Sequence, residues 1–183
     1  MKTTTMIIRV WIAMAGLLTG QLATAQESLN LSAFKGKYKG AVSQVGPGAG
    51  NTASGLASVG FKVPQSGTSA RIRYTAAFSD DMGDTNVLPT SMDLTSNQRV
   101  SVTDLLVGIA GTNNAKPGTG DWIQRKRILK IDATNGEGIT LRGTAVVKDL
   151  RNKRKLTLTL VSDDGVDTRT FTTRLRARLP RQN

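Results

Sequence analysis

Hydrophobic and polar residues alternate along four successive stretches near the C-terminus. In the last stretch, Phe171, Thr173 and Leu175 fall on one side of an extended chain, whereas Arg174 and Arg176 fall on the other. Successive side chains of a β-strand point to opposite faces of its sheet. The pattern therefore predicts strands that bury one face and present cations on the other.

Short turn segments separate these stretches. Asn135-Gly136, Asp149 to Asn152 and Asp163-Asp164-Gly165 favour hairpins, because asparagine, aspartate and glycine tolerate positive φ angles. Because short loops join the neighbouring stretches, we expect their strands to pair in antiparallel fashion. The expected strands cover about 122–133, 139–148, 154–162 and 167–179.

The N-terminal half alternates in the same way, but less regularly. Its expected strands are an opening run from Phe34 to Val42 and further runs at about 54–63, 69–78 and 99–109. The segments 46–54, 79–98 and 111–121 are expected to be loops, with room for one helical turn within 87–98. About eight strands in all predict an all-β fold, either a small closed antiparallel barrel or a two-sheet sandwich.

The first 25 residues have the features of a secretory signal peptide. Lys2 and Arg9 accompany an apolar run from Val10 to Leu18, and Ala23-Thr24-Ala25 fits the small-x-small cleavage rule. The apolar run is shorter than the roughly 20 residues that a membrane-spanning helix needs. We expect cleavage after Ala25, export to the periplasm or the extracellular space, and a single all-β domain over residues 26–183.

Composition narrows the chemistry that the chain can perform. It contains 25 lysine and arginine residues against 13 aspartate and glutamate residues, a formal net charge of +12, and no histidine or cysteine. Ser-His-Asp and Cys-His catalysis, disulfides and the usual zinc and haem sites are therefore excluded. The aspartate-rich turns lack EF-hand spacing. We expect no metal, no cofactor and a non-enzymatic role, with a carbohydrate-cleaving enzyme that uses loop aspartates as the catalytic alternative.

The segment Phe34-Lys35-Gly36-Lys37-Tyr38-Lys39-Gly40 opens the first expected strand, and its Gly-x-Tyr step resembles the start of lipocalin-like (calycin) barrels. The resemblance implies that the aromatic ring closes one end of an eight-stranded barrel and that an arginine of the last strand covers the ring. It also implies an internal cavity that carries a small apolar ligand. The residues expected to line this cavity are Tyr38, Phe61, Tyr74, Phe78 and Leu158.

Cations alternate with apolar residues in several of the expected strands and so share the outer face of the sheet. A surface of one charge sign attracts polyanions. For an exported protein, we expect these to be anionic polysaccharide, lipopolysaccharide or an anionic lipid surface. The residues assigned to polyanion contact are Lys35, Lys37, Lys39, Arg71, Arg73, Arg174, Arg176 and Arg178.

The same charges also have a purely structural interpretation. Lysine on a sheet edge blocks unwanted strand pairing, and a net charge far from zero keeps a protein dispersed. A structural secreted domain is therefore the second alternative, beside the carrier. We expect no specific nucleic-acid binding, because the basic stretches lack aromatic residues that could stack on bases. We expect no membrane-spanning barrel, because its outward cations would enter lipid.

Overall fold

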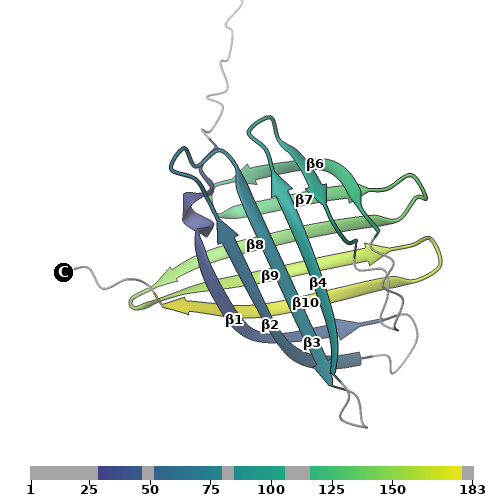
Figure 1. Ribbon diagram of the computed structural model, residues 1–183. Helices are drawn as coiled ribbons and strands as arrows, with labels where there is room; N and C mark the ends of the chain where they lie inside the picture. Colours follow the sequence, from purple (N-terminus) through teal and green to yellow (C-terminus); the bar gives the residue numbers. More distant parts are fainter. Residues whose placement is uncertain (1–28, 47–51, 80–84, 106–115, 179–183) are drawn as a thin grey trace, which may run out of the picture.

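A computed structural model describes residues 29–46, 52–79, 85–105 and 116–178 of the chain. In these ranges the regular elements are strands, preceded by one short 3-10 helix. They are η1 (Leu31–Phe34), β1 (Gly36–Val45), β2 (Thr52–Lys62), β3 (Ala70–Ser79), β4 (Thr85–Leu94), β5 (Arg99–Val102), β6 (Gly118–Arg125), β7 (Ile128–Thr134), β8 (Thr140–Leu150), β9 (Lys153–Asp163) and β10 (Thr168–Arg178). Each strand pairs antiparallel with the next, and β1 pairs with β10, so the ten strands form a closed barrel (Figure 1).

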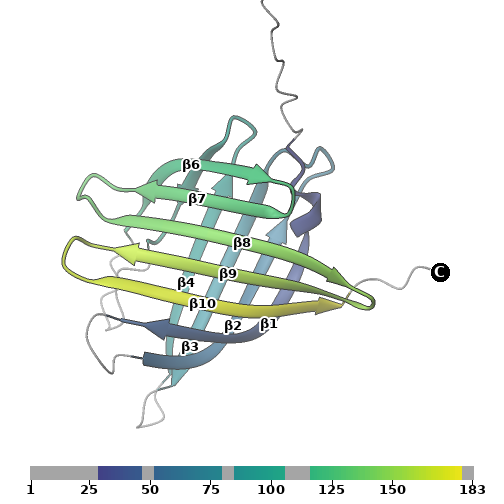
Figure 2. The same cartoon turned by 180° about the vertical axis from the view of Figure 1, so that it is seen from behind.

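The barrel closes along the seam between β1 and β10, where strands from the two ends of the described chain meet. Lys39 is opposite Arg176 at one end of this ladder, and Val45 is opposite Thr170 at the other. In Figure 1 the strands β1–β4 cross the near side. The reverse view in Figure 2 has β6–β10 on its near side, with β1 beside β10. The strands β8, β9, β10 and β1 therefore follow one another along one side of the barrel.

Inward-pointing alternate residues of the strands form one apolar core. The rings of Phe78 in β3 and Phe171 in β10 have centroids 6.3 Å apart. Because β2 and β1 separate these strands in the sheet, the contact must cross the barrel interior. The largest fully buried side chains include Trp122, Tyr38, Tyr74, Phe34 and Phe171.

The 3-10 helix η1 packs against one end of the barrel (Figure 1). The Tyr38 hydroxyl donates a hydrogen bond to the Phe34 carbonyl oxygen at 2.9 Å, which ties this helix to β1. The arginine beside Tyr38 is Arg154 of β9. The expectation that an arginine of the last strand would cover the ring was wrong, since Arg174 and Arg176 of β10 are exposed. Their alternation with buried residues points them outward.

The predicted all-β class, antiparallel pairing and closed barrel are confirmed, but the number of strands was wrong. The barrel has ten strands rather than about eight, and its closure excludes the two-sheet sandwich. One additional strand, β4, replaces much of the predicted 79–98 loop and its helical turn. Thr90, Met92 and Leu94 are buried in β4 and alternate with Pro89 and polar residues. The threonine and proline content concealed this alternation in the sequence.

A second additional strand arises because the predicted strand at 122–133 is two strands, β6 and β7. Lys126 turns the chain between them with a φ angle of 53°. Neither Lys126 nor Arg127 is a typical turn residue, so no local signal marked this hairpin. The expected strand at 99–109 is also shorter, since β5 ends at Val102, and β6 begins at Gly118 inside the predicted 111–121 loop.

Some predictions fall outside the described residues. These are the signal peptide and its cleavage site, residues 106–109 of the expected 99–109 strand, the parts of the predicted loops at 47–51, 80–84 and 111–115, and the side chain of Arg178. In the ranges that the structure covers, no helix has the length and apolar character needed to cross a membrane.

Candidate functional site

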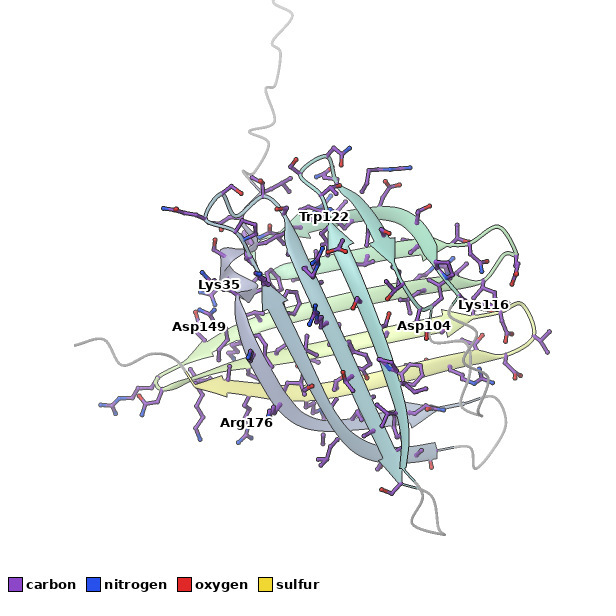
Figure 3. The ribbon with its side chains drawn as sticks, viewed as in Figure 1. Lys35, Asp104, Lys116, Trp122, Asp149 and Arg176 are labelled. Atoms are coloured by element: carbon purple, nitrogen blue, oxygen red, sulfur yellow. The ribbon has the colours of Figure 1, made fainter. Side chains whose placement is uncertain are left out.

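Four cations lie side by side on the outer wall of the barrel: Lys39 of β1, Arg176 of β10, Lys155 of β9 and Lys148 of β8. Each is directly opposite the next across a strand pair, and all four are exposed. We call this set the cationic row. Neighbouring strands are about 4.8 Å apart, so the row spans roughly 14 Å. Figure 3 shows Arg176 on the outside of the barrel wall.

The cationic row has no neutralising acid within the described part of the chain. None of the ion pairs found there involves a member of the row. Like charges directly opposite each other in a sheet are destabilising, by up to about 1 kcal/mol for a pair. The folded protein therefore carries a local repulsion that a bound anion would relieve.

Another row on the outer wall has the same geometry but balanced charge. Arg99 of β5, Asp121 of β6, Asp132 of β7 and Arg142 of β8 are opposite one another in turn. Arg99 Nη1 lies 2.6 Å from Asp121 Oδ1, and Arg142 Nε lies 3.7 Å from Asp132 Oδ2. We call this set the neutral row. The lack of acids in the cationic row is thus a local property and not a feature of the whole barrel surface.

Further cations widen the positive surface around the cationic row. Each lies two residues from a member of the row, on the same face of the same strand, and is exposed. The backbone of Arg178 also pairs here, opposite Lys153. The flanking cations are Lys37, Lys153 and Arg174.

The structure brings together only some of the residues predicted to contact polyanions. Arg71 and Arg73 are exposed on β3, on the far side of β2 from the seam, and Arg71 Nε lies 2.6 Å from Asp93 Oδ1. Lys35 is exposed just before β1 at the end of the barrel where η1 lies. The predicted residues that adjoin one another across the seam are Lys37, Lys39, Arg174 and Arg176.

Lys148 and Lys155 were recognised as cations but were not among the predicted contact residues. Alternation within their strands places both on the outer face. The register of the β8–β9 hairpin sets Lys148 opposite Lys155, and that of β9–β10 sets Lys155 opposite Arg176. Turn lengths in the sequence could have suggested the first pairing.

A separate cluster of arginine and carboxylate groups lies beside Lys148. Asp149 Oδ1 accepts a hydrogen bond from Arg154 Nε at 2.6 Å, and its Oδ2 accepts one from Arg127 Nη1 at 2.7 Å. These two hydrogen bonds hold the pKa of Asp149 below its usual range. Figure 3 places Asp149 at the same end of the barrel as Lys35. Arg127 and Arg154 are engaged here and add less to the open positive surface.

The barrel end also contains a buried phenol. Burial raises the pKa of Tyr38, and the nearby Arg154 guanidinium acts in the opposite direction. Arg154 Nη1 also donates to the Lys35 carbonyl oxygen at 3.4 Å. Arg154 thus links β9 to the segment that leads into β1, which is a structural role.

The residues predicted to line an apolar cavity, Tyr38, Phe61, Tyr74, Phe78 and Leu158, are all buried. They belong to the continuous apolar core, so their inward orientation follows from strand alternation alone. Their part in ligand binding stays a prediction. A hollow of about 340 Å³ opens separately between β6, β7 and β8, and it is lined partly by Asp121, Asp132 and Arg142 of the neutral row.

Two aspartate side chains of the 163–167 turn accept hydrogen bonds from backbone amides of the same turn. Asp163 Oδ1 accepts a hydrogen bond from the Gly165 amide, and Asp164 Oδ1 accepts one from the Asp167 amide. Within the described ranges, no group of three or more acidic, histidine or cysteine side chains is arranged to hold a metal ion. The other aspartate-rich segment, 80–84, lies outside those ranges.

No protein-family model matches this chain, and no curated protein is significantly similar to it. The structure shows the closed antiparallel barrel. The resemblance to lipocalin-like barrels stays a prediction, because no family match supports it.

Proposed function

We propose that the protein is a non-enzymatic binding protein for linear anionic polysaccharides, which it holds along the cationic row. The observation that carries this proposal is the direct opposition of Lys39, Arg176, Lys155 and Lys148 across four strands without an acidic partner among the described residues.

The shape of the cationic row favours a polymer over a small anion. Its members are exposed and arranged in a line. A polymer chain that lies across the strands meets a cation about every 4.8 Å. Each exposed contact contributes little, but contacts made by one chain act together, because the first contact raises the effective concentration for the next.

Closure of the barrel weakens the structural interpretation of these charges. A closed barrel has no exposed strand edge, so lysine is not required there to prevent edge-to-edge pairing. Solubility requires only net charge, which cations at any surface position supply. A requirement for solubility does not explain why four cations are placed directly opposite one another, where their repulsion lowers stability.

The test is retention on immobilised heparin as a model anionic polysaccharide, measured as the salt concentration at elution and as Kd. The test variant replaces the cationic row by serine: Lys39→Ser, Lys148→Ser, Lys155→Ser and Arg176→Ser. The control variant removes the same net charge from exposed positions elsewhere: Lys62→Ser, Arg125→Ser, Lys126→Ser and Lys130→Ser. Four contacts of about 0.5 kcal/mol each predict that the row variant binds at least about tenfold more weakly, with a much smaller loss for the control.

Equal losses in the two variants would contradict the proposal, because binding would then depend on total charge. Binding to vesicles that contain phosphatidylglycerol, without binding to heparin, would replace the polysaccharide by an anionic lipid surface.

A further inference from the structure

Three polar groups inside the barrel have no hydrogen-bond partner among the described residues. They are Gln44 Oε1, the Tyr74 hydroxyl and the Thr173 hydroxyl. Gln44, Tyr74 and Thr173 are only 3%, 1% and 0% exposed, respectively, so bulk water does not satisfy them. Native proteins leave few buried polar groups without a partner, and each such group calls for an explanation. Ordered water and a bound ligand are the usual ones.

The three groups come from three different strands, and Thr173 of β10 lies near each of the other two. Val42 and Gln44 point inward from β1, and Thr173 of β10 is directly opposite Val42. Gln44 and Thr173 are therefore diagonal neighbours on the inner face. Tyr74 approaches Thr173 from β3, and the Thr173 hydroxyl is close enough to lower the pKa of Tyr74 against the larger, opposite effect of burial. Neither hydroxyl makes a hydrogen bond of good geometry, so both still lack a partner.

Apolar side chains, either small or aromatic, lie next to these groups. Ala57 of β2 and Ala76 of β3 are opposite each other on the inner wall, one alternation step from Tyr74. The Phe78 and Phe171 rings, 6.3 Å apart, pack on the other side, since Phe171 is opposite Gln44. Two alanines, which have the smallest side chains of the apolar core, thus lie beside an aromatic surface.

We propose that Gln44, Tyr74 and Thr173 bind a small neutral ligand that has an apolar body and a hydroxyl group. Gln44 Oε1 can only accept, so the ligand hydroxyl donates to it and accepts from Thr173 or Tyr74. The apolar body packs against the aromatic pair. This interior site is separate from the cationic row, and the proposal does not depend on the proposed function.

We expect the ligand to be neutral because the described interior offers no charged side chain to pair with it. None of the buried side chains in the described residues is charged. A buried carboxylate would have no counter-charge and would pay a large desolvation cost. Burial raises the pKa of Tyr74 to about 12, so the phenol remains a neutral hydrogen-bond donor at physiological pH.

The experiment compares three probes of similar size: benzyl alcohol, toluene and benzoate. Each is titrated into the full-length protein, and binding is followed by NMR through the methyl resonances of Ala57, Ala76 and Thr173. We expect benzyl alcohol to cause saturable shifts of these resonances. Toluene lacks the hydroxyl, so we expect it to bind about three- to tenfold more weakly. Benzoate is charged and is expected not to bind.

Two variants of similar shape test the polar contacts. Tyr74→Phe and Thr173→Val should each weaken benzyl alcohol binding about three- to tenfold and leave toluene binding unchanged. The control is Thr90→Val, which removes a buried hydroxyl that already has a partner, the Asp104 carbonyl oxygen. It is expected to lower stability without changing the preference for benzyl alcohol over toluene.

The proposal is overturned if benzyl alcohol gives no saturable shift, if toluene binds as tightly, or if Tyr74→Phe and Thr173→Val leave the alcohol affinity unchanged. A crystal structure in which ordered water satisfies all three groups, and remains there after soaking with benzyl alcohol, overturns it as well.

Discussion

Lys39 and Arg176 face each other directly across the seam that closes the barrel. Two cations in this position repel each other, and no acid in the described ranges forms an ion pair with either of them. A sheet that was selected for stability alone would place opposite charges here, as the neutral row does at its two ends, where Arg99 is opposite Asp121 and Arg142 is opposite Asp132. The seam is thus the place where stability and the proposed binding function compete.

Reversing one charge at the seam should stabilise the protein and weaken polyanion binding. We expect Lys39→Glu to raise the free energy of unfolding by about 0.5–1 kcal/mol at low salt, because repulsion becomes attraction. Urea denaturation measures this change, and heparin retention measures the loss of binding. The gain should shrink in 1 M salt, where surface charges are screened. A variant that is less stable at low salt would contradict this account of the seam.

Removing the Asp149 carboxylate should make stability depend less on pH. Hydrogen bonds from Arg154 and Arg127 hold the pKa of Asp149 low in the folded state. The ionised carboxylate therefore stabilises the folded protein fully above the unfolded pKa of about 3.9, and this stabilisation is lost as pH falls through the pKa of the folded state. We expect Asp149→Asn to cost about 1 kcal/mol at pH 7. Denaturation at pH 7 and in acid measures the difference between the two proteins, which should disappear in acid.

Asp132→Asn is the control for that experiment. Asp132 lies 3.7 Å from Arg142, and both side chains are about two-thirds exposed. Its loss should change stability by only a few tenths of a kcal/mol. An equal effect of the two substitutions would show that the Asp149 cluster has no special role.

Burial of Tyr74 predicts that the protein loses stability at alkaline pH. Burial raises the pKa of Tyr74 to about 12, whereas an unfolded tyrosine titrates near 10. The free energy of unfolding should therefore be unaffected by Tyr74 below pH 10 and fall as pH rises from about 10 to about 12. The loss is on the order of 2 kcal/mol. Tyr74→Phe should flatten this part of the stability curve.

Tyrosinate absorbance provides an independent check of this prediction. The chain has only two tyrosines, and both Tyr38 and Tyr74 are buried. Because burial raises the pKa of both tyrosines, native protein should develop the absorbance at higher pH than denatured protein, in which it develops at about pH 10. Coincident titration curves would contradict the burial of both rings.

Gly120 should not tolerate a side chain. A Cβ at this position would lie 1.9 Å from the Asp132 carbonyl oxygen and 2.7 Å from the Ala133 Cα atom, both of which belong to the backbone of β7. Gly120→Ala must therefore push β6 and β7 apart, and we expect a loss of about 3 kcal/mol or failure to fold. Thermal denaturation of the variant and the unmodified protein measures this loss of stability.

Gly60→Ala is the matched control, since a Cβ there would have no atom within 4 Å. It should be neutral or slightly stabilising, because alanine restricts the unfolded chain. Similar losses for the two variants would mean that backbone freedom, and not the close approach of β7, explains Gly120.

The sequence pattern predicted the class of fold well, because strand alternation is a local property. Leu156, Leu158 and Leu160 are buried as expected, and Arg174 and Arg176 are exposed. The pattern failed where the local signal was weak. Pro89 and the threonines concealed β4, and the turn at Lys126 has no typical turn residue.

The candidate sites required information that alternation does not contain. Which cations become neighbours depends on strand register, and β1 meets β10 only through closure of the barrel. Lys39 could be assigned to the outer face from sequence, but its position opposite Arg176 could not. The meeting of Tyr74 and Thr173 depends in the same way on how strands from distant parts of the chain curve toward each other.

The seam also bears on when the protein can act during its own biosynthesis. Its two strands are the first and the last to be synthesised, so a chain still attached to the ribosome or emerging from a translocation pore cannot complete the wall. Under the proposed function, the complete cationic row would exist only after β10 has been synthesised and has paired with β1.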